Sequence, residues 1–299
     1  MKKTMWVILT LMATLSLTGC CCCCASRSET SSRLAQRIQA GPVQRETHDI
    51  GPEKAEQVDV IVQFGGGEIY VTEGGESLLS GEFVYNLDEL KPAIEYNVKG
   101  KQGRLHIRHE VDAIRWDRFT DKVRNEWTLR FTGEMPLHMN LDVGGSSGEL
   151  DLGGLQIAGL DLTVGAADMK VSFDEPNPVR MGSMRVRSGA ARLELDNLGN
   201  ANLEELTFDG GVGSYTFDFS GQWQRSADVK IQAGASNILL RVPHDVGVRV
   251  CPGSLRGGDY DKLKKQDNCY VNERYGESDI TVDIHLDVGL SDLRIKQVN

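Results

Sequence analysis

The feature that most constrains the fold of this chain is a glycine that recurs between two strands of alternating hydrophobicity. In each unit a strand with apolar residues at every second position leads to the glycine, and a second such strand follows after two or three small or polar residues. The central five glycines are separated by 21, 24, 22 and 23 residues, with one related unit before them and one after. The repeat-turn glycines are Gly65, Gly144, Gly165, Gly189, Gly211, Gly234 and Gly289.

A repeat of nearly constant length is typical of solenoids, in which each turn buries its apolar face on the next. The period of two within each strand means that one side of every strand faces inward. We therefore predict an all-β fold, a single-stranded β-solenoid of strand-glycine-strand units. Glycine is expected where the chain bends between the two strands, because a residue without Cβ permits the bend at no steric cost.

The competing fold is a β-sandwich built from hairpins of similar length. The constant unit favours the solenoid, and hairpin turns would favour Asn-Gly or Asp-Gly over the Gly-Ala-Ala found here. Helix is expected only near residues 32–39 and 259–266. Two insertions interrupt the repeat, and both are expected to cover the open strand edges at the ends of a solenoid.

The N-terminal residues predict export and lipid attachment. A basic start at Lys2 and Lys3, a short apolar run over residues 5–17 and the sequence Leu-Thr-Gly-Cys ending at Cys20 have the layout of a lipoprotein signal. An ordinary signal peptide that happens to end in cysteine is the alternative. Residues 21–24 are also cysteines, which would carry further acyl chains or form a tolerated stretch beside the membrane.

These observations divide the chain into three parts. The predicted parts are a signal peptide at 1–19, the lipidated Cys20 with a flexible polar tether at 20–55, and the solenoid at 56–299 with insertions at 74–136 and 243–283. The protein is then placed outside the cytoplasm, on the outer face of the cell membrane or on an outer membrane. A disulfide between Cys251 and Cys269 fits this compartment, with two free thiols as the alternative.

The charge of the chain limits its partners. The formal net charge is -10, and removal of Lys2 and Lys3 with the signal peptide would make it -12. Phosphate groups are bound by Lys and Arg, so nucleic acid and anionic lipid headgroups are not expected as partners. The oligomeric state is left open.

Few side chains suggest chemistry. His106, His109 and Glu110 lie close in sequence, but positions 106 and 109 of a strand face opposite sides, so no metal site is expected there. Acids follow the glycine in three units (Glu68, Asp168 and Asp292), whereas other units have Arg192, Ser214 and Asn237 at that place. Turn polarity explains these acids better than calcium, because the calcium β-roll motif is missing. Three tryptophans, Trp116, Trp127 and Trp223, are expected to pack in the core or in a cap.

The glycine repeats are accompanied by two specific segments, Gly81-Glu82-Phe83 and Asn125-Glu126-Trp127. With them, residues 58–299 resemble the bacterial toastrack domains (DUF2154), β-solenoids related to proteins of the LiaF type. The resemblance implies a role in the cell envelope, with response to membrane or wall stress as the best-known theme, and it implies no catalytic residues. The chain departs from the LiaF pattern because a lipid takes the place of the transmembrane helices that precede the solenoid there.

Two functions are therefore considered. The first is a non-enzymatic envelope lipoprotein that binds a protein partner or a wall component, or that serves as a scaffold. The second is a carbohydrate-binding or carbohydrate-active β-helix protein, since paired carboxylates on such a fold can cleave glycans. No cofactor, metal or catalytic residue is assigned from the sequence.

Overall fold

The structure is a computed structural model that describes residues 39–110, 122–253 and 259–298. The chain divides into two compact units, residues 1–36 and 37–299, and all the described residues belong to the second. The predicted signal peptide, Cys20 and the helix expected near residues 32–39 fall outside the described residues, apart from residue 39. Within the described part, none of the helices has the length and apolar character needed to cross a membrane.

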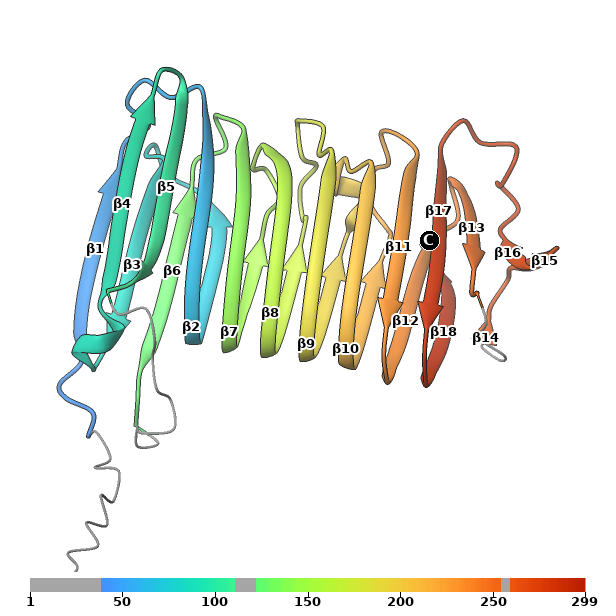
Figure 1. The fold of residues 1–299 in the computed structure, drawn as a ribbon. Coiled ribbons are helices and arrows are strands. Elements are labelled where there is room, and N and C mark those ends of the chain that lie inside the picture. The colour runs from blue at the N-terminus through green and yellow to red at the C-terminus, as the bar shows by residue number, and fades with distance from the viewer. Residues whose placement is uncertain (1–38, 111–121, 254–258, 299) are drawn as a thin grey trace, which may run out of the picture. The chain divides into compact units, whose positions relative to one another are not determined.

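The described residues form strands and two 3₁₀ helices, η1 (Asp88–Leu90) and η3 (Leu198–Ala201), and they contain no α-helix (Figure 1). Seven repeat units, called rungs below, follow one another along the chain. Each rung has a first arm before its glycine corner and a second arm after it. Five rungs are single bent strands: β2 (Gln57–Glu73), β7 (Leu137–Asp151), β8 (Ile157–Ser172), β9 (Ser183–Asp196) and β10 (Glu205–Asp218). Two rungs are divided at the corner: β11 (Ala227–Ala233) with β12 (Ser236–Pro243), and β17 (Thr281–Val288) with β18 (Ser291–Val298).

Successive rungs pair in parallel and in register on both sides of the corner. In β7 and β8, Leu141 lies beside Leu162 on the first arms, and Leu150 lies beside Val171 on the second arms. The inward side chains of both arms belong to one apolar cluster, so the core lies between the two arms. The hairpins of a β-sandwich would have paired antiparallel. The predicted all-β solenoid is therefore confirmed.

The first insertion forms a cap on β2. Its strands are β3 (Leu79–Tyr85), β4 (Pro92–Lys99), β5 (Gln102–His109) and β6 (Asn125–Phe131). Strands β5 and β6 extend the two arms of β2 in parallel, and β4 and β3 then add antiparallel. This reversal of direction ends the parallel stacking at the N-terminal side.

A further strand, β1 (Gln44–Ile50), pairs antiparallel with β3. The tether predicted to extend to residue 55 is therefore too long, and the folded part begins earlier than residue 56. The strand was hidden by its polar composition, because β1 has no fully buried side chain and is held mainly by its backbone pairing.

The second insertion contains β13 (Gly247–Cys251), β14 (Asp259–Tyr260), β15 (Lys264–Gln266) and β16 (Cys269–Val271). The helix expected over residues 259–266 is wrong, since this segment contributes to two strands. Lys262 and Asp267 have φ values of 58° and 53°, and such left-handed positions interrupt a helix. Strand β13 adds to β17 in parallel, and the β15–β16 hairpin then pairs antiparallel with β13.

The corner glycines form a column in which backbone lies against backbone. A methyl group on Gly144 would lie 2.2 Å from the carbonyl oxygen of Gly65, and one on Gly211 would lie 2.4 Å from that of Gly189. At Gly165, Gly189, Gly234 and Gly289 the corresponding distances to the glycine of the preceding rung are 2.9–3.0 Å. None of these six has a φ in the left-handed region. The corner therefore needs glycine for close approach between rungs, and not for the bend itself as the sequence suggested.

Buried asparagines satisfy the backbone of the turns that return the chain to the next rung. The amide nitrogen of Asn177 donates to Ile157 O at 2.8 Å and Ala201 O at 3.0 Å, and its Oδ1 accepts from Ile157 N–H and Val179 N–H. Asn200 has a similar place one rung further on, donating to Phe173 O at 2.8 Å. Buried polar backbone groups without partners would cost about 1–3 kcal/mol each, so these side chains make the turns possible.

The glycine column predicts opposite results for two neighbouring substitutions. Gly144→Ala should lower the free energy of unfolding by about 1–3 kcal/mol, because its methyl group has to displace the Gly65 carbonyl. Gly145→Ala should change it by less than about 0.5 kcal/mol, since the exposed methyl group would meet no atom within 4 Å. Urea unfolding measures both. Equal effects of the two changes would contradict the close-approach explanation.

Candidate functional site

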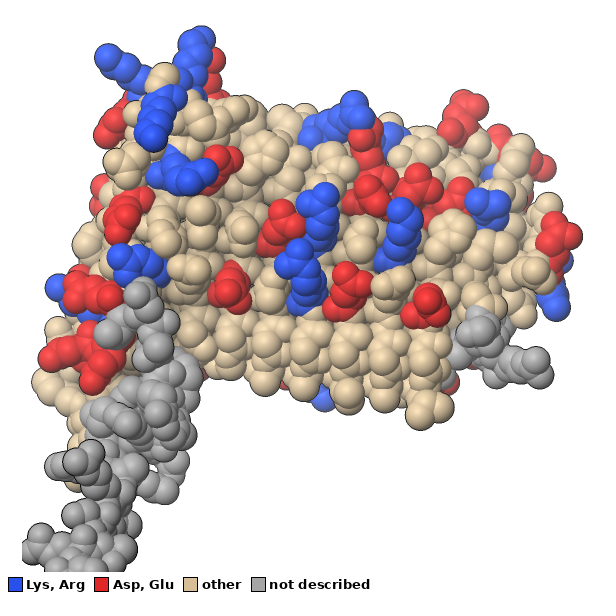
Figure 2. Space-filling model, in the orientation of Figure 1, with Lys and Arg blue, Asp and Glu red and all other residues tan. Residues whose placement is uncertain are grey.

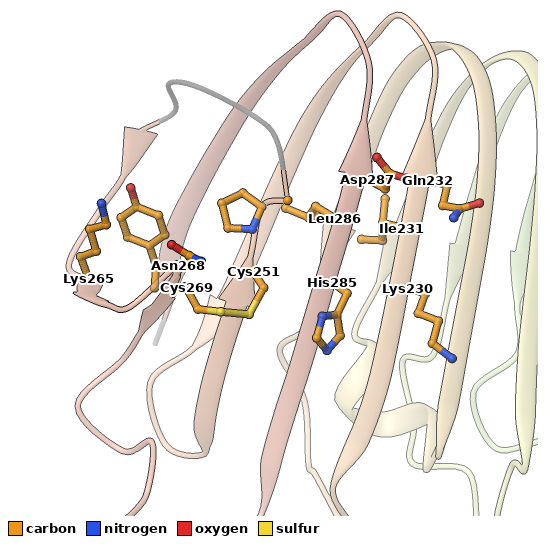
Figure 3. A pocket seen from close by; sticks show the side chains of 13 residues that line it. Lys230, Ile231, Gln232, Cys251, Lys265, Asn268, Cys269, His285, Leu286 and Asp287 are labelled. Atoms are coloured by element: carbon orange, nitrogen blue, oxygen red, sulfur yellow. A yellow bond between two sulfur atoms is a disulfide. The ribbon is translucent and has the colours of Figure 1, made fainter.

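A hollow of about 790 Å³ lies at the outer face of the first arms, near the C-terminal end of the solenoid (Figure 3). Its floor is formed by β11 and β17, and its wall by the end of β13 and the β15–β16 hairpin. The polar side chains that line it are Lys230, Gln232, His285, Asp287, Lys265, Asn268 and Tyr270. A volume in this range is typical of small-molecule and cofactor sites.

A second hollow of about 570 Å³ adjoins the first and shares Gln232 and Asp287 with it. It extends to Asp209 on β10 and to the corner glycines Gly211 and Gly289. We refer to the two hollows together as the trough.

The parallel register of the rungs arranges the floor of the trough in rows. Asp209, Gln232 and Asp287 lie side by side on three successive first arms. Neighbouring strands are about 4.8 Å apart, so these three side chains form a ladder with a carboxylate at each end. A second row contains Lys230, His285 and Cys251. The rows follow from the period of two, which points every second side chain of each first arm outward.

The disulfide between Cys251 and Cys269 is present and fixes the wall of the trough. Cys251 lies on the outward side of β13, so the bond holds the β15–β16 hairpin against the outer face of the first arms (Figure 3). The paired sulfurs offer no thiol to a ligand.

Charges of both signs surround the trough. Lys230 Nζ lies 3.0 Å from Glu205 Oε1, Arg249 is paired with Asp283, and Lys264 Nζ lies 3.1 Å from Glu273 Oε1. Figure 2 shows positively and negatively charged side chains mixed in this way over the visible face. Below them lies a band without charged side chains. Such mixed pairing gives no strong field of a single sign.

The three residues His106, His109 and Glu110 do not converge. His109 is buried, whereas His106 Nε2 lies 2.9 Å from Gln63 Oε1 on the outer face, and Glu110 pairs with Lys91. Across the described residues, no group of three His, Cys, Asp or Glu side chains is placed to hold a metal ion.

The structure gives His109 a structural position that the sequence did not reveal. Its Nδ1–H donates to Leu90 O at 3.1 Å and its Nε2 accepts from Gly65 N–H at 3.4 Å, which requires the neutral ring. Its ring centroid lies 4.8 Å from that of Trp127, in the apolar core of the N-terminal cap. Burial lowers the pKa of His109.

The tryptophans and the post-glycine acids are not grouped into a site. Trp127 is fully buried, and Trp223 donates its indole N–H to Phe219 O at 2.8 Å, while Trp116 lies outside the described residues. Glu68, Asp168 and Asp292 belong to one row of the second arms but are separated by intervening rungs. Asp168 pairs with Arg192 of the next rung at 3.3 Å.

One carboxylate pair stands out on the second arms. Asp196 and Asp218 lie on neighbouring rungs, and Arg241 Nη1 is 3.9 Å from Asp196 Oδ1 and 3.3 Å from Asp218 Oδ2. Burial, followed by the nearby charge of Asp218, raises the pKa of Asp196. A carboxyl group with a raised pKa beside a second carboxylate is a starting point for acid–base chemistry.

Comparison with known proteins identifies a family. The model of the N-terminal domain of toast_rack, DUF2154, matches residues 39–181 and 177–241. No curated protein matches the chain.

Solved structures with a similar chain path include a "putative cell adhesion protein" from Clostridium sporogenes, with 22% identity and a TM-score of 0.43. The match covers 86% of this chain and 100% of that one. A "putative adhesin" from Bacteroides fragilis has 12% identity and a TM-score of 0.39, with 87% of this chain and 100% of that one covered.

The buried neutral ring of His109 predicts a loss of stability in mild acid. The unfolded chain takes up a proton on this histidine near pH 6.5, whereas the folded chain does so only at lower pH. The free energy of unfolding therefore falls as the pH drops below about 6.5, by at most about 1.4 kcal/mol per pH unit. It becomes constant again below the pKa that His109 has in the folded chain. Urea unfolding from pH 8 to pH 5 should show a shallower pH dependence for His109→Gln than for the wild type. His106→Gln is the control, and a wild-type slope that persists in His109→Gln would contradict the assignment.

The disulfide predicts a local contribution to stability. Its loop spans 18 residues, and closing a loop of that size stabilises the folded state by about 3 kcal/mol in the chain-entropy description. Reductant should therefore lower the free energy of unfolding of the wild type and leave the Cys251→Ser/Cys269→Ser double variant unchanged. If the wild type and the double variant unfold at the same denaturant concentration, the bond does not fix the wall of the trough.

Proposed function

The chain belongs to the family of the N-terminal domain of toast_rack, DUF2154, and from this premise we propose that it is an extracytoplasmic lipoprotein that binds a component of the cell envelope without catalysis. The trough is the binding surface in this proposal, and Cys20 carries the lipid. The partner is a wall component or another envelope protein. In its more specific form, the proposal is that the protein senses envelope stress, and that binding of a ligand in the trough is the signal.

The observation that carries the proposal is the open polar trough on a rigid floor. Its floor strands are paired on both sides along their first arms, and its wall is cross-linked by a disulfide. A surface that is already fixed loses little conformational entropy when a ligand binds. Its polar groups are spread along a row and do not converge on one point, which suits holding an extended ligand better than a chemical step.

The N-terminal sequence supports the lipid anchor. Residues 1–19 have the layout of a lipoprotein signal, and Cys20 follows directly. The 23 residues between Cys20 and the start of β1 at Gln44 can span at most about 80 Å, at up to about 3.6 Å per residue. A lipid on Cys20 would thus keep the trough near the membrane while leaving it accessible to envelope polymers.

Sedimentation with isolated cell envelopes tests the proposal. The full chain carrying Cys20→Ser cannot be held by lipid on that residue, but it keeps its apolar signal peptide, so the envelopes are first stripped of membrane lipid and the retention is compared with that of a Gln232→Trp variant of the same chain. We expect it to co-sediment with wall material and to lose this binding when Gln232→Trp fills the trough. A Cys20→Ser chain that stays in the supernatant with every envelope fraction would defeat the proposed function.

The second candidate function is glycan cleavage, and the Asp196–Asp218 pair is the observation that favours it. Neighbouring strands are about 4.8 Å apart, so the two carboxyl groups can reach the separation of about 5 Å that is typical of retaining glycosidases. In that case the wild type would release reducing ends from a panel of glycans, and Asp196→Asn would abolish the release. Absence of release from the whole panel would leave the binding function.

The lipid attachment has a direct test. Radiolabelled fatty acid fed to cells that express the protein should label the wild type and the Cys21→Ser control, because Cys20 is the residue next to the predicted cleavage point. Cys20→Ser should remain unlabelled and should keep its signal peptide. Equal labelling of Cys20→Ser and the wild type would contradict attachment at this residue.

A further inference from the structure

We propose that the trough binds an uncharged, hydroxyl-rich saccharide chain that lies across the rungs along the row of Asp209, Gln232 and Asp287. This inference rests on the proposed binding function and adds the chemical class of the ligand. It is carried by four properties of the trough: the uncommitted polar groups of the row, their spacing, the balance of charge and the composition of the wall.

The side chains of the row are available for a ligand. Many outward charged side chains in this fold pair with a neighbour one rung away, as Lys170 does with Glu149 and Arg192 with Asp168. The side chains of Asp209, Gln232 and Asp287 are exposed and form no hydrogen bond or ion pair with any other described residue. These three side chains can therefore bind a ligand without first breaking a contact within the protein.

The row offers the hydrogen-bonding pattern that sugar hydroxyl groups need. Each hydroxyl group both donates and accepts. The carboxylates of Asp209 and Asp287 accept only, and the amide of Gln232 between them both donates and accepts. A chain of linked sugars can therefore donate at both ends of the row and exchange hydrogen bonds at its centre.

The regular spacing favours a polymeric ligand. Three successive rungs repeat the polar position about every 4.8 Å, and the row runs perpendicular to the strands. A ligand made of repeated polar units can meet successive rungs in the same manner. A compact ligand would use one end of the row and leave the rest without partners.

The balance of charge selects against strongly charged polymers. An anionic chain along the row would meet the carboxylates of Asp209 and Asp287, neither of which forms an ion pair with a described cation, although Arg187 lies beside Asp209 on the preceding rung. A cationic chain would meet Lys230, Lys265 and the Arg249 of the neighbouring ion pair. A neutral chain avoids both repulsions and still uses the polar groups.

The wall completes the site on the side of the disulfide. Asn268 contributes a second exposed amide, and the half-buried Tyr270 brings an aromatic ring. An aromatic body with a polar tip suits a sugar, whose ring has apolar C–H faces between its hydroxyl groups. The disulfide holds both residues near the row.

Affinity gel electrophoresis tests the inference with defined polymers. The full Cys20→Ser chain would be run through gels containing dextran, mannan or soluble N-acetylglucosamine oligomers as neutral probes, polygalacturonate as the anionic probe and chitosan as the cationic probe. We expect retardation by at least one neutral probe. It should persist between about 0.1 and 1 M salt, where the Debye length falls from about 10 to about 3 Å.

Matched variants locate the binding. Gln232→Ala should weaken the affinity for the neutral probe by roughly tenfold, the effect of losing one or two hydrogen bonds. Asn237→Ala removes an exposed amide from the second arm of the same rung and should leave the affinity unchanged. Circular dichroism would confirm that both variants fold.

Each contrary result has a clear meaning. Migration unaffected by all neutral probes would overturn the inference, as would an equal loss of affinity in Gln232→Ala and Asn237→Ala. Retardation by polygalacturonate or chitosan alone, abolished by Gln232→Ala, would overturn the ligand class while leaving the proposed binding function intact. Failure of envelope co-sedimentation would instead remove that function.

Discussion

The structure depends on how closely one rung approaches the next at its corner. The corner glycines stack in a column, and a methyl group on Gly144 or Gly211 would collide with the carbonyl of the glycine before it. This contact keeps both arms of each rung in register with the next, and the register encloses the apolar core between them. A larger side chain at a corner would separate the arms there and expose the core.

The same register creates the candidate site. Because successive first arms pair in register, their outward side chains fall into rows, and the residue type at each position of a row decides whether that position is charged or paired with its neighbour. Elsewhere on the solenoid, several outward side chains form ion pairs across rungs, as at Lys170 and Glu149 and at Arg192 and Asp168. The trough differs because the outer face is hollowed there and because a disulfide-linked hairpin covers one side.

The repeat made the fold predictable, since period two and fixed glycine spacing together leave few alternatives. The sequence could not reveal β1, whose polar residues show no buried face, or the buried His109, whose partners Leu90 and Gly65 are distant along the chain. Asn177 and Asn200 are 23 residues apart, which matches the spacing of the corner glycines. Two asparagines at that spacing are not enough to predict a turn motif from the sequence. The trough was invisible because it needs side chains from three rungs and the second insertion.

The central claim, that close approach at the corner determines the register, is tested most directly by alanine at four glycines of the column. Urea unfolding should show the largest loss of stability at Gly211, where the added methyl group would lie 2.4 Å from a carbonyl oxygen. Smaller, similar losses are predicted at Gly165, Gly189 and Gly234, where that distance is 2.9–3.0 Å. The account would be contradicted if the loss in free energy of unfolding at Gly211 were no larger than at the other three glycines, or if alanine at Gly211 stabilised the protein.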